Sequence, residues 1–159
     1  MDVKIDNETQ SFKFRVNCII FNKGKVLLLD MNKNGFLCLP GGHVHIGEDS
    51  KEAVIRETME EVGITSQSQR LVACVENFFE NKKGKKFHEL SFYYVMENPT
   101  IPEDKQKNFH YVENDEGKLV DLDFKWISLQ DVEKEDIRPV VLKEILKDGA
   151  KSFKHYFVK

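Results

Sequence analysis

The chain contains only three cysteines, and their spacing argues against the common cysteine-based sites. Cys18, Cys38 and Cys74 are odd in number and no two of them form a CxxC pair. A zinc site is therefore not expected. We expect three reduced, buried thiols that behave as small apolar residues, which places the protein in the cytoplasm.

Long hydrophobic runs and an excess of basic residues are also missing. No stretch approaches the length of a membrane span, and the first ten residues lack the apolar core of a signal peptide. The formal net charge is -3, which argues against non-specific binding to DNA and to anionic membranes. A phosphate-bearing substrate would therefore need a bound cation and local basic residues.

The composition that is present fits one folded domain spanning residues 1–159. Hydrophobic residues make up 40% of the chain and charged residues 32%. A chain of this length can bury roughly 70% of its unfolded surface, which is enough for a sizeable core. Twelve phenylalanines against one tryptophan predict that this core is rich in Phe.

Aromatic and β-branched runs separated by turn residues predict a series of strands. The expected strands are 12–21, 26–29, 36–39, 71–80, 87–96, 122–127 and 153–158. Helical spacing predicts a central helix near 50–62, a short one at 129–132 and another at 140–146. The polar segment 97–119 predicts a loop of more than twenty residues, typical of a lid, a specificity loop or a disordered excursion. Strands on both sides of a central helix favour an α+β sandwich.

The central helix carries both its start and its stop signals. Asp49 and Ser50 are natural N-caps, Glu52 can close a capping box, and Gly63 supplies a left-handed C-cap. At about 100° per residue, Glu57, Glu60 and Glu61 share one face, with Ala53 beside Glu57. The opposite face is expected to pack against the core through Ile55, Thr58, Met59 and Val62.

Three glutamates on an exposed helix face usually form no more than a solvated surface. At this spacing, however, like charges repel unless a cation lies between them. Clustered carboxylate oxygens are the ligands that Mg²⁺ or Mn²⁺ prefers.

The spacing of the whole stretch is more specific than the helix alone. Gly42 is followed at fixed intervals by Glu48, Arg56-Glu57, Glu60-Glu61, Gly63 and Ile64. This pattern resembles the Nudix box of the Nudix (MutT-like) hydrolases, and would match a given window by chance on the order of once in 10⁸. The segment that leads into the box, Leu39-Pro40-Gly41-Gly42, is a second point of resemblance. The pattern departs at Thr58, where the family usually has an aliphatic residue, and at Leu37, where it often has tryptophan.

The resemblance implies a Nudix fold, in which a mixed β-sheet is sandwiched between α-helices. It also implies a hydrolase that cleaves a nucleoside diphosphate linked to another moiety by water attack at phosphorus with a divalent metal. On this basis Glu57, Glu60 and Glu61 are the expected catalytic metal ligands, with the Gly42 carbonyl as a backbone ligand. Arg56 and Glu48 are expected to pair and hold the loop against the helix. The expected cofactor is Mg²⁺, with Mn²⁺ as a substitute.

The remaining site residues are less constrained by the pattern. The general base lies either in the box or outside it. The candidates outside the box are Glu89, Glu113, Asp115 and Glu116, although each could also be an ordinary charged surface residue. Candidate substrate-binding residues are His43, His45, His88 and Phe79, although histidines in a polar loop are often incidental and strand aromatics often belong to the core.

Several functional alternatives stay open at this point. A non-catalytic nucleotide-binding Nudix domain would be expected to lose box carboxylates, whereas this chain keeps all of them. An RNA 5′-pyrophosphohydrolase is disfavoured by the acidic balance, and an isomerase acting on a diphosphate ester lacks supporting residues. We expect a small nucleotide-type substrate and neither DNA nor a membrane as partner, and we leave homodimerisation open. The family's markers for ADP-ribose and for dinucleoside polyphosphates are both absent, so the substrate is not specified.

Overall fold

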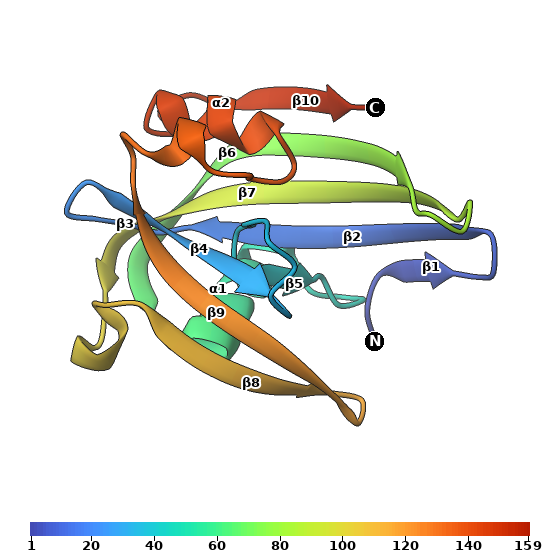
Figure 1. Cartoon of the computed structure of the whole chain (residues 1–159), viewed down its shortest axis with the longest axis horizontal. Coiled ribbons are helices and arrows are strands. Elements are labelled where there is room, and N and C mark those ends of the chain that lie inside the picture. Colours follow the sequence, from blue (N-terminus) through green and yellow to red (C-terminus); the bar gives the residue numbers. More distant parts are fainter.

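Ten strands form two sheets in the computed structural model, which describes all 159 residues (Figure 1). The strands of the larger sheet are β1 (Lys4–Asp6), β2 (Gln10–Ile19), β5 (Gly41–His43), β6 (Thr65–Glu80), β7 (Lys86–Thr100) and β10 (Lys154–Val158). They are ordered β1-β2-β7-β6-β10, with β5 also paired to β2. This sheet is mixed, because β2 and β10 run parallel to their neighbours β7 and β6 while β6 and β7 are antiparallel.

The smaller sheet is entirely antiparallel. Its strands are β3 (Phe21–Asn22), β4 (Lys25–Met31), β8 (Phe109–Asp115) and β9 (Lys118–Ser128), in the order β3-β4-β9-β8. The helices are α1 (Ser50–Val62) and α2 (Val141–Lys147). In Figure 1, α2 lies above the larger sheet and α1 lies below it.

Two hydrophobic cores lie on the two faces of the larger sheet. One core joins residues of β6 and β7 to Leu142, Ile145 and Leu146 of α2. The other joins residues of β2 and the smaller sheet to Ala53, Val54 and Val62 of α1. The predicted α+β architecture, with a mixed sheet between helices, is confirmed. No helix is both long and apolar enough to cross a membrane.

The expected caps of α1 are present. The Asp49 side chain accepts hydrogen bonds from the backbone N–H groups of Lys51 and Glu52, and the Glu52 carboxylate accepts one from the Asp49 N–H. Gly63 ends the helix with φ 67°, a conformation that glycine adopts without strain. The helix therefore begins and ends where its sequence predicts.

The prediction of its packing face was partly wrong. The buried residues of α1 are Ala53, Val54, Thr58 and Val62, whereas Ile55 and Met59 are 45% and 48% exposed. The helix packs against β5, β2 and β6. The small side chain of Ala53 allows a close approach there, so the buried stripe is rotated toward Ala53. The acidic residues consequently lie at the border of the core and not opposite it.

Three predicted segments have different boundaries in the structure. The expected strand 12–21 divides at Ile20, where the chain passes from the larger sheet to β3 of the smaller one. The segment 36–39 makes only single bridges, Leu37 to Ile137 and Cys38 to Leu29. The short helix expected at 129–132 is a single 3₁₀ turn at Val132–Lys134.

The long loop predicted at 97–119 is wrong. Strand β7 continues to Thr100, and after one 3₁₀ turn at Glu103–Lys105 the chain forms the β8–β9 hairpin. Glu116 and Gly117 both have positive φ at its tip, as a tight two-residue hairpin turn requires. Phe109 stacks on Phe124 at 4.5 Å, but most other residues of β8 are exposed and polar, so the strand lacks an alternating hydrophobic signal.

The remaining predicted elements are confirmed, and most of them are longer than expected. Segments 71–80, 87–96 and 122–127 lie within β6, β7 and β9, while 140–146 and 153–158 correspond to α2 and β10. All three cysteines are free thiols. Cys18 is buried as expected, whereas Cys38 and Cys74 are only half-buried.

Candidate functional site

The glycine turn before α1 lies directly against two glutamates of that helix. The backbone N–H of Gly41 donates a hydrogen bond to Glu61 Oε2 at 2.8 Å. A Cβ atom placed on Gly42 would overlap the carboxylate of Glu57. Strand β5 fixes this turn, because Gly41 and Gly42 pair with Asn17 and Val16 of β2. Only glycine at position 42 therefore allows the Glu57 carboxylate to lie against the backbone.

Arg56 joins the loop to the acidic face of α1. Its Nε and Nη2 atoms donate to the two oxygens of Glu48 at 2.7 and 2.9 Å. Nη2 also donates to the His43 carbonyl at 3.0 Å, while Nη1 contacts Glu57 at 2.7 Å and Glu60 at 3.2 Å. The Arg56 hydrogen bond lowers the pKa of Glu48 to about 2. The arginine thus contacts three carboxylates and connects both ends of the loop.

Glu61 is the most buried carboxylate of the site. Burial raises the pKa of Glu61 to about 8, with further raising by the charges of Glu113 and Glu57. The Gly41 N–H and the Arg15 guanidinium act in the opposite direction. A buried carboxylate with so little compensation fits a site that takes up a positive charge.

The donor set fits a hard divalent cation, although the glutamates are not gathered as they would be around one. No group of three or more His, Cys, Asp or Glu side chains lies close enough to hold a metal ion. Glu57 and Glu60 instead accept hydrogen bonds from Arg56, and Glu61 accepts one from the Gly41 N–H. The donors are carboxylate oxygens beside a glycine that admits close approach, and both features suit Mg²⁺ or Mn²⁺.

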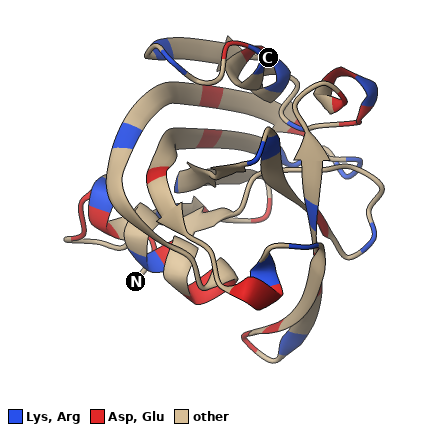
Figure 2. Ribbon diagram, turned by 90° about the vertical axis from the view of Figure 1, so that its left-hand side faces the viewer, with Lys and Arg blue, Asp and Glu red and all other residues tan.

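The structure separates the four general-base candidates outside the box. Glu113 on β8 faces the acidic side of α1, and its pKa is raised by burial and by the charges of Asp115, Glu57 and Glu60. Figure 2 shows the acidic residues of α1 and of the β8–β9 hairpin at the same end of the molecule. Asp115 and Glu116 lie at the hairpin tip, where their charges add to the Asp2 hydrogen bond and charge that chiefly raise the pKa of Lys4. Glu89 instead lines a cavity on the larger sheet.

The histidine candidates lie in three different environments. His43 pairs with Arg15 across β5 and β2, and burial lowers the pKa of His43 to about 4. His45 lies 3.4 Å from Asp2 and 3.9 Å from Glu48. His88 stacks on Phe78 with ring centroids 4.3 Å apart, on the sheet face opposite Glu89. His88 is therefore not part of the cavity.

A cavity of about 660 Å³ opens on the face of the larger sheet that carries Glu89, opposite the face that carries His88. It lies between that sheet and the two loops 34–39 and 136–140, and the candidate Phe79 is in its wall. Its polar wall residues from the sheet are Arg15, Asn17, Asn77, Glu89, Ser91 and Tyr93. None of their side chains makes a hydrogen bond or ion pair within the chain. Their polar atoms are open to the cavity and are therefore available to a ligand.

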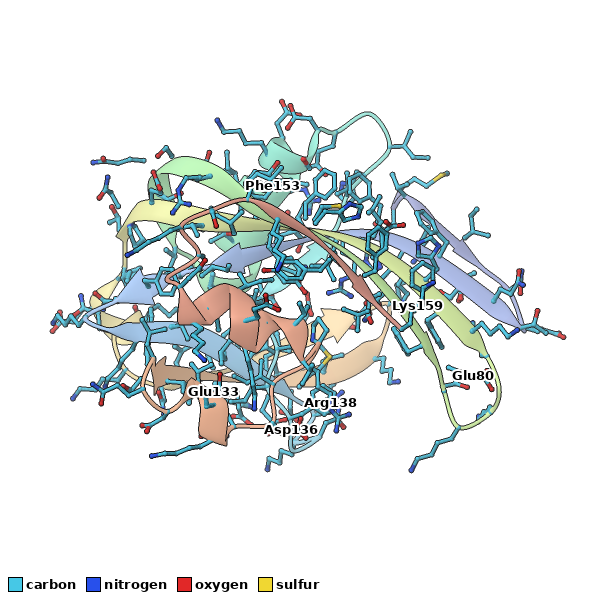
Figure 3. The ribbon with its side chains drawn as sticks, turned by 90° about the horizontal axis from the view of Figure 1, so that it is seen from above. Glu80, Glu133, Asp136, Arg138, Phe153 and Lys159 are labelled. Carbon is cyan, nitrogen blue, oxygen red and sulfur yellow. The ribbon has the colours of Figure 1, made fainter.

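Two charged residues form part of the rim of this cavity. Arg138 lies over the ring of Phe36 at 4.3 Å and also contacts Asp136 at 3.1 and 3.3 Å. Figure 3 shows Asp136 and Arg138 side by side on the chain that precedes α2. Backbone hydrogen bonds from Leu37 N to Asp136 O and from Arg138 N to Leu37 O tie the two rim loops together. The cavity therefore has a fixed edge.

Sequence reasoning missed four of the polar cavity residues: Arg15, Asn17, Asn77 and Ser91. One signal could have found them. Arg15 and Asn17 alternate along β2, and Glu89 and Ser91 alternate along β7, within strands that are otherwise mainly aromatic and aliphatic. Polar residues at a period of two place a polar stripe on one face of a sheet.

Comparisons with known proteins agree with this geometry. The model of the NUDIX domain matches residues 12–148. An uncharacterized Nudix hydrolase, YvcI of Bacillus subtilis, is 30% identical over 77% of this chain and 70% of its own length. An ADP-ribose pyrophosphatase of Methanocaldococcus jannaschii is 32% identical over 52% of this chain, which spans only 48% of that protein. The crystal structure of the MutT protein from Bacillus halodurans has a TM-score of 0.65 at 24% identity, covering 91% of this chain and 86% of that one. At that identity the match shows the fold alone.

Proposed function

Because this chain belongs to the Nudix family of hydrolases, we propose that it is a metal-dependent pyrophosphohydrolase of small nucleotide-type substrates. It would cleave a nucleoside diphosphate linked to another moiety by attack of water at phosphorus. One observation carries this proposal. In the wall of the polar cavity, Asn17 pairs with Gly41 of β5 and the charge of Arg15 acts on Glu61, so a substrate can place its phosphates at the box and its organic group in the cavity.

Arg15 lies at the junction of these two regions. It pairs with His43 of β5, its charge acts on Glu61, and its side chain lines the cavity. It makes no ion pair within the chain. An unpaired guanidinium suits a phosphate oxygen because its planar fork can donate two hydrogen bonds. We assign Arg15 to the phosphate that carries the organic group.

The residues of the box would bind the metal ion and hold the loop in place. Glu57, Glu60, Glu61 and the Gly42 carbonyl would hold Mg²⁺ or Mn²⁺. When bound, the ion neutralises the pyrophosphate oxygens and lowers the pKa of the attacking water. Arg56 would keep the loop on the helix through Glu48. Glu113 is our choice of general base, because it faces the acidic side of α1 and its raised pKa brings proton affinity closer to neutral pH.

The cytoplasm is the compartment that we propose for this reaction. Three free thiols, of which two are half-buried, support a reducing environment.

A substrate screen combined with one variant tests the proposal. Phosphate release would be measured with nucleoside triphosphates, ADP-ribose, nucleotide sugars and dinucleoside polyphosphates in the presence of Mg²⁺ or Mn²⁺. Glu61→Gln should lower turnover by about a hundredfold or more, since a neutral amide cannot balance a divalent charge. Its melting temperature should change little, because the amide oxygen can still accept the Gly41 hydrogen bond.

The matched control is Glu133→Gln, an exposed residue on the surface turn before α2, visible in Figure 3. It should match the wild type in turnover and in melting temperature. A fully active Glu61→Gln variant would exclude Glu61 as a metal ligand. Tight nucleotide binding without hydrolysis of any substrate would favour a non-catalytic binding domain instead.

A further inference from the structure

The polar wall of the cavity is ordered across the larger sheet. His43 on β5 pairs with Arg15 on β2, and Arg15 pairs with Ser91 on β7. Glu89 lies two residues before Ser91 on β7 and therefore on the same face of the sheet. It pairs with Asn77 on β6. Neighbouring strands are about 4.8 Å apart. Glu89 is therefore about 10 Å and Asn77 about 15 Å from the strand that carries the box glycines.

Glu89 and Asn77 form a cross-strand pair with no partners of their own. Neither side chain makes a hydrogen bond within the chain, and Glu89 forms no ion pair with Arg15 although both line the cavity. The other cavity carboxylate, Asp136, is paired with Arg138. The polar atoms of both side chains are open to the cavity, where a ligand can pair with them. The arrangement thus calls for a ligand rich in hydrogen-bond donors at this point.

We propose that Glu89 and Asn77 bind the edge of a 2-amino-4-oxopyrimidine ring, which guanine and pterins share. That edge presents a ring N–H and an exocyclic NH₂ side by side, followed by a carbonyl oxygen. The carboxylate of Glu89 accepts from both nitrogens, and the amide of Asn77 donates to the carbonyl. Phe79, also in the cavity wall, stacks on Phe87 through one ring face with centroids 4.8 Å apart, which leaves its other face to stack on the base.

Other bases do not match this pair of side chains. Adenine and cytosine place a ring nitrogen with a lone pair beside their amino group, and this lone pair would face the carboxylate. Uracil has one N–H between two carbonyls. Each of them leaves at least one oxygen of Glu89 without a donor or facing another acceptor. A site built on hydrogen bonds discriminates strongly against such ligands, because its polar groups stay unpaired.

This assignment rests on the proposed function, since the phosphates must lie at the box for the base to reach Glu89. It also changes the role expected of Glu89. A carboxylate two strands away from β5 is too far from the box to take a proton from water attacking there. Glu89 becomes a specificity residue, and Glu113 is left as the general base.

The test combines binding with turnover. Calorimetry would compare binding of GMP and AMP to the metal-free wild type, and kcat/KM would be measured for GTP, a pterin triphosphate, ATP, UTP and CTP. We expect GMP to bind at least about tenfold more tightly than AMP, because AMP leaves Glu89 unpaired. Comparison of GTP with the pterin triphosphate identifies which of the two ring systems is the better substrate.

Glu89→Gln should lower GMP affinity by about tenfold or more, since one of its two acceptors becomes a donor. Asn77→Asp, of the same shape, should also weaken GMP binding by placing an acceptor against the carbonyl. The control Glu80→Gln carries the same change on an exposed residue at the end of β6, far from Asp136 in Figure 3, and should match the wild type.

The outcomes separate the two proposals. Selective GMP binding without hydrolysis would overturn the hydrolase function and keep the assignment of Glu89 and Asn77. Hydrolysis of all nucleoside triphosphates at similar kcat/KM, with equal binding of GMP and AMP, would keep the function and overturn the assignment. Unchanged GMP affinity in both Glu89→Gln and Asn77→Asp would also overturn it, as would failure of the wild type to bind GMP.

Discussion

Arg56 and Glu48 form a two-point hydrogen-bonded ion pair across the loop that leads into α1, with N···O distances of 2.7 and 2.9 Å. The pair joins residues eight positions apart in the sequence, and Glu48 also accepts from the His45 N–H at 3.0 Å. Both side chains are mostly shielded from water, with 22% and 15% exposed. Because the same arginine reaches the His43 carbonyl, one side chain sets the position of the loop relative to the acidic face.

Replacement of Arg56 should therefore reduce stability and activity together. Arg56→Ala leaves Glu48 and Glu57 partly buried without a counter-charge, which should lower the free energy of unfolding by about 2 kcal/mol. Turnover should fall as well, because the loop no longer holds Gly42 against α1. Urea unfolding and phosphate release measure the two effects. Arg56→Lys should retain only part of the stability and part of the turnover, since an ammonium cannot make the two parallel hydrogen bonds to Glu48. Loss of activity with unchanged stability would exclude the role of Arg56 in holding the loop.

The same ion pair predicts how the stability of the folded chain depends on pH. The pKa of Glu48 is about 2 in the folded chain against an ordinary value of 4.5. The unfolded state therefore binds more protons than the folded state between these values. Stability from Glu48 is fully present above about pH 4.5 and is lost as the pH falls toward 2. Urea midpoints from pH 7 to pH 3 should fall less steeply for Glu48→Gln than for the wild type. Equal slopes would show that Glu48 has an ordinary pKa in the folded protein.

The central helix, its caps and the Arg56–Glu48 pair could be predicted because their determinants are local. Caps are determined by residues within three positions of the helix end, and the box is a fixed spacing within one segment. The packing face was harder to predict, since it depends on what lies opposite. Ile55 is more hydrophobic than Ala53, yet Ala53 is buried in the core and Ile55 is exposed. Hydrophobicity alone could not have shown this.

The cavity could not be predicted from any one segment. Arg15, Glu89 and Asn77 come from three strands, and only the pairing register places them side by side. Their alternation with apolar neighbours was visible in the sequence, but the partner strands were not. The β8–β9 hairpin was missed for a related reason. Its outer strand is stabilised mainly by pairing with β9, so its polar sequence gave no strand pattern.

The two glycines of the turn should respond differently to the same substitution. A Cβ on Gly41 would collide with backbone atoms of Val16 and Asn17 in β2, which cannot move without breaking the sheet. A Cβ on Gly42 would instead overlap the Glu57 carboxylate, the end of a flexible side chain. Gly41→Ala should thus lower the free energy of unfolding by about 2 kcal/mol or more, as overpacking of a rigid site does. Gly42→Ala should cost less stability, because Glu57 can rotate away, but it should lower turnover and weaken the thermal stabilisation produced by Mg²⁺. Melting curves with and without Mg²⁺, combined with phosphate release, distinguish the two variants. If Gly42→Ala kept both full turnover and the full Mg²⁺ shift, the Glu57 carboxylate would not need its position against the turn, and its assignment as a metal ligand would be wrong.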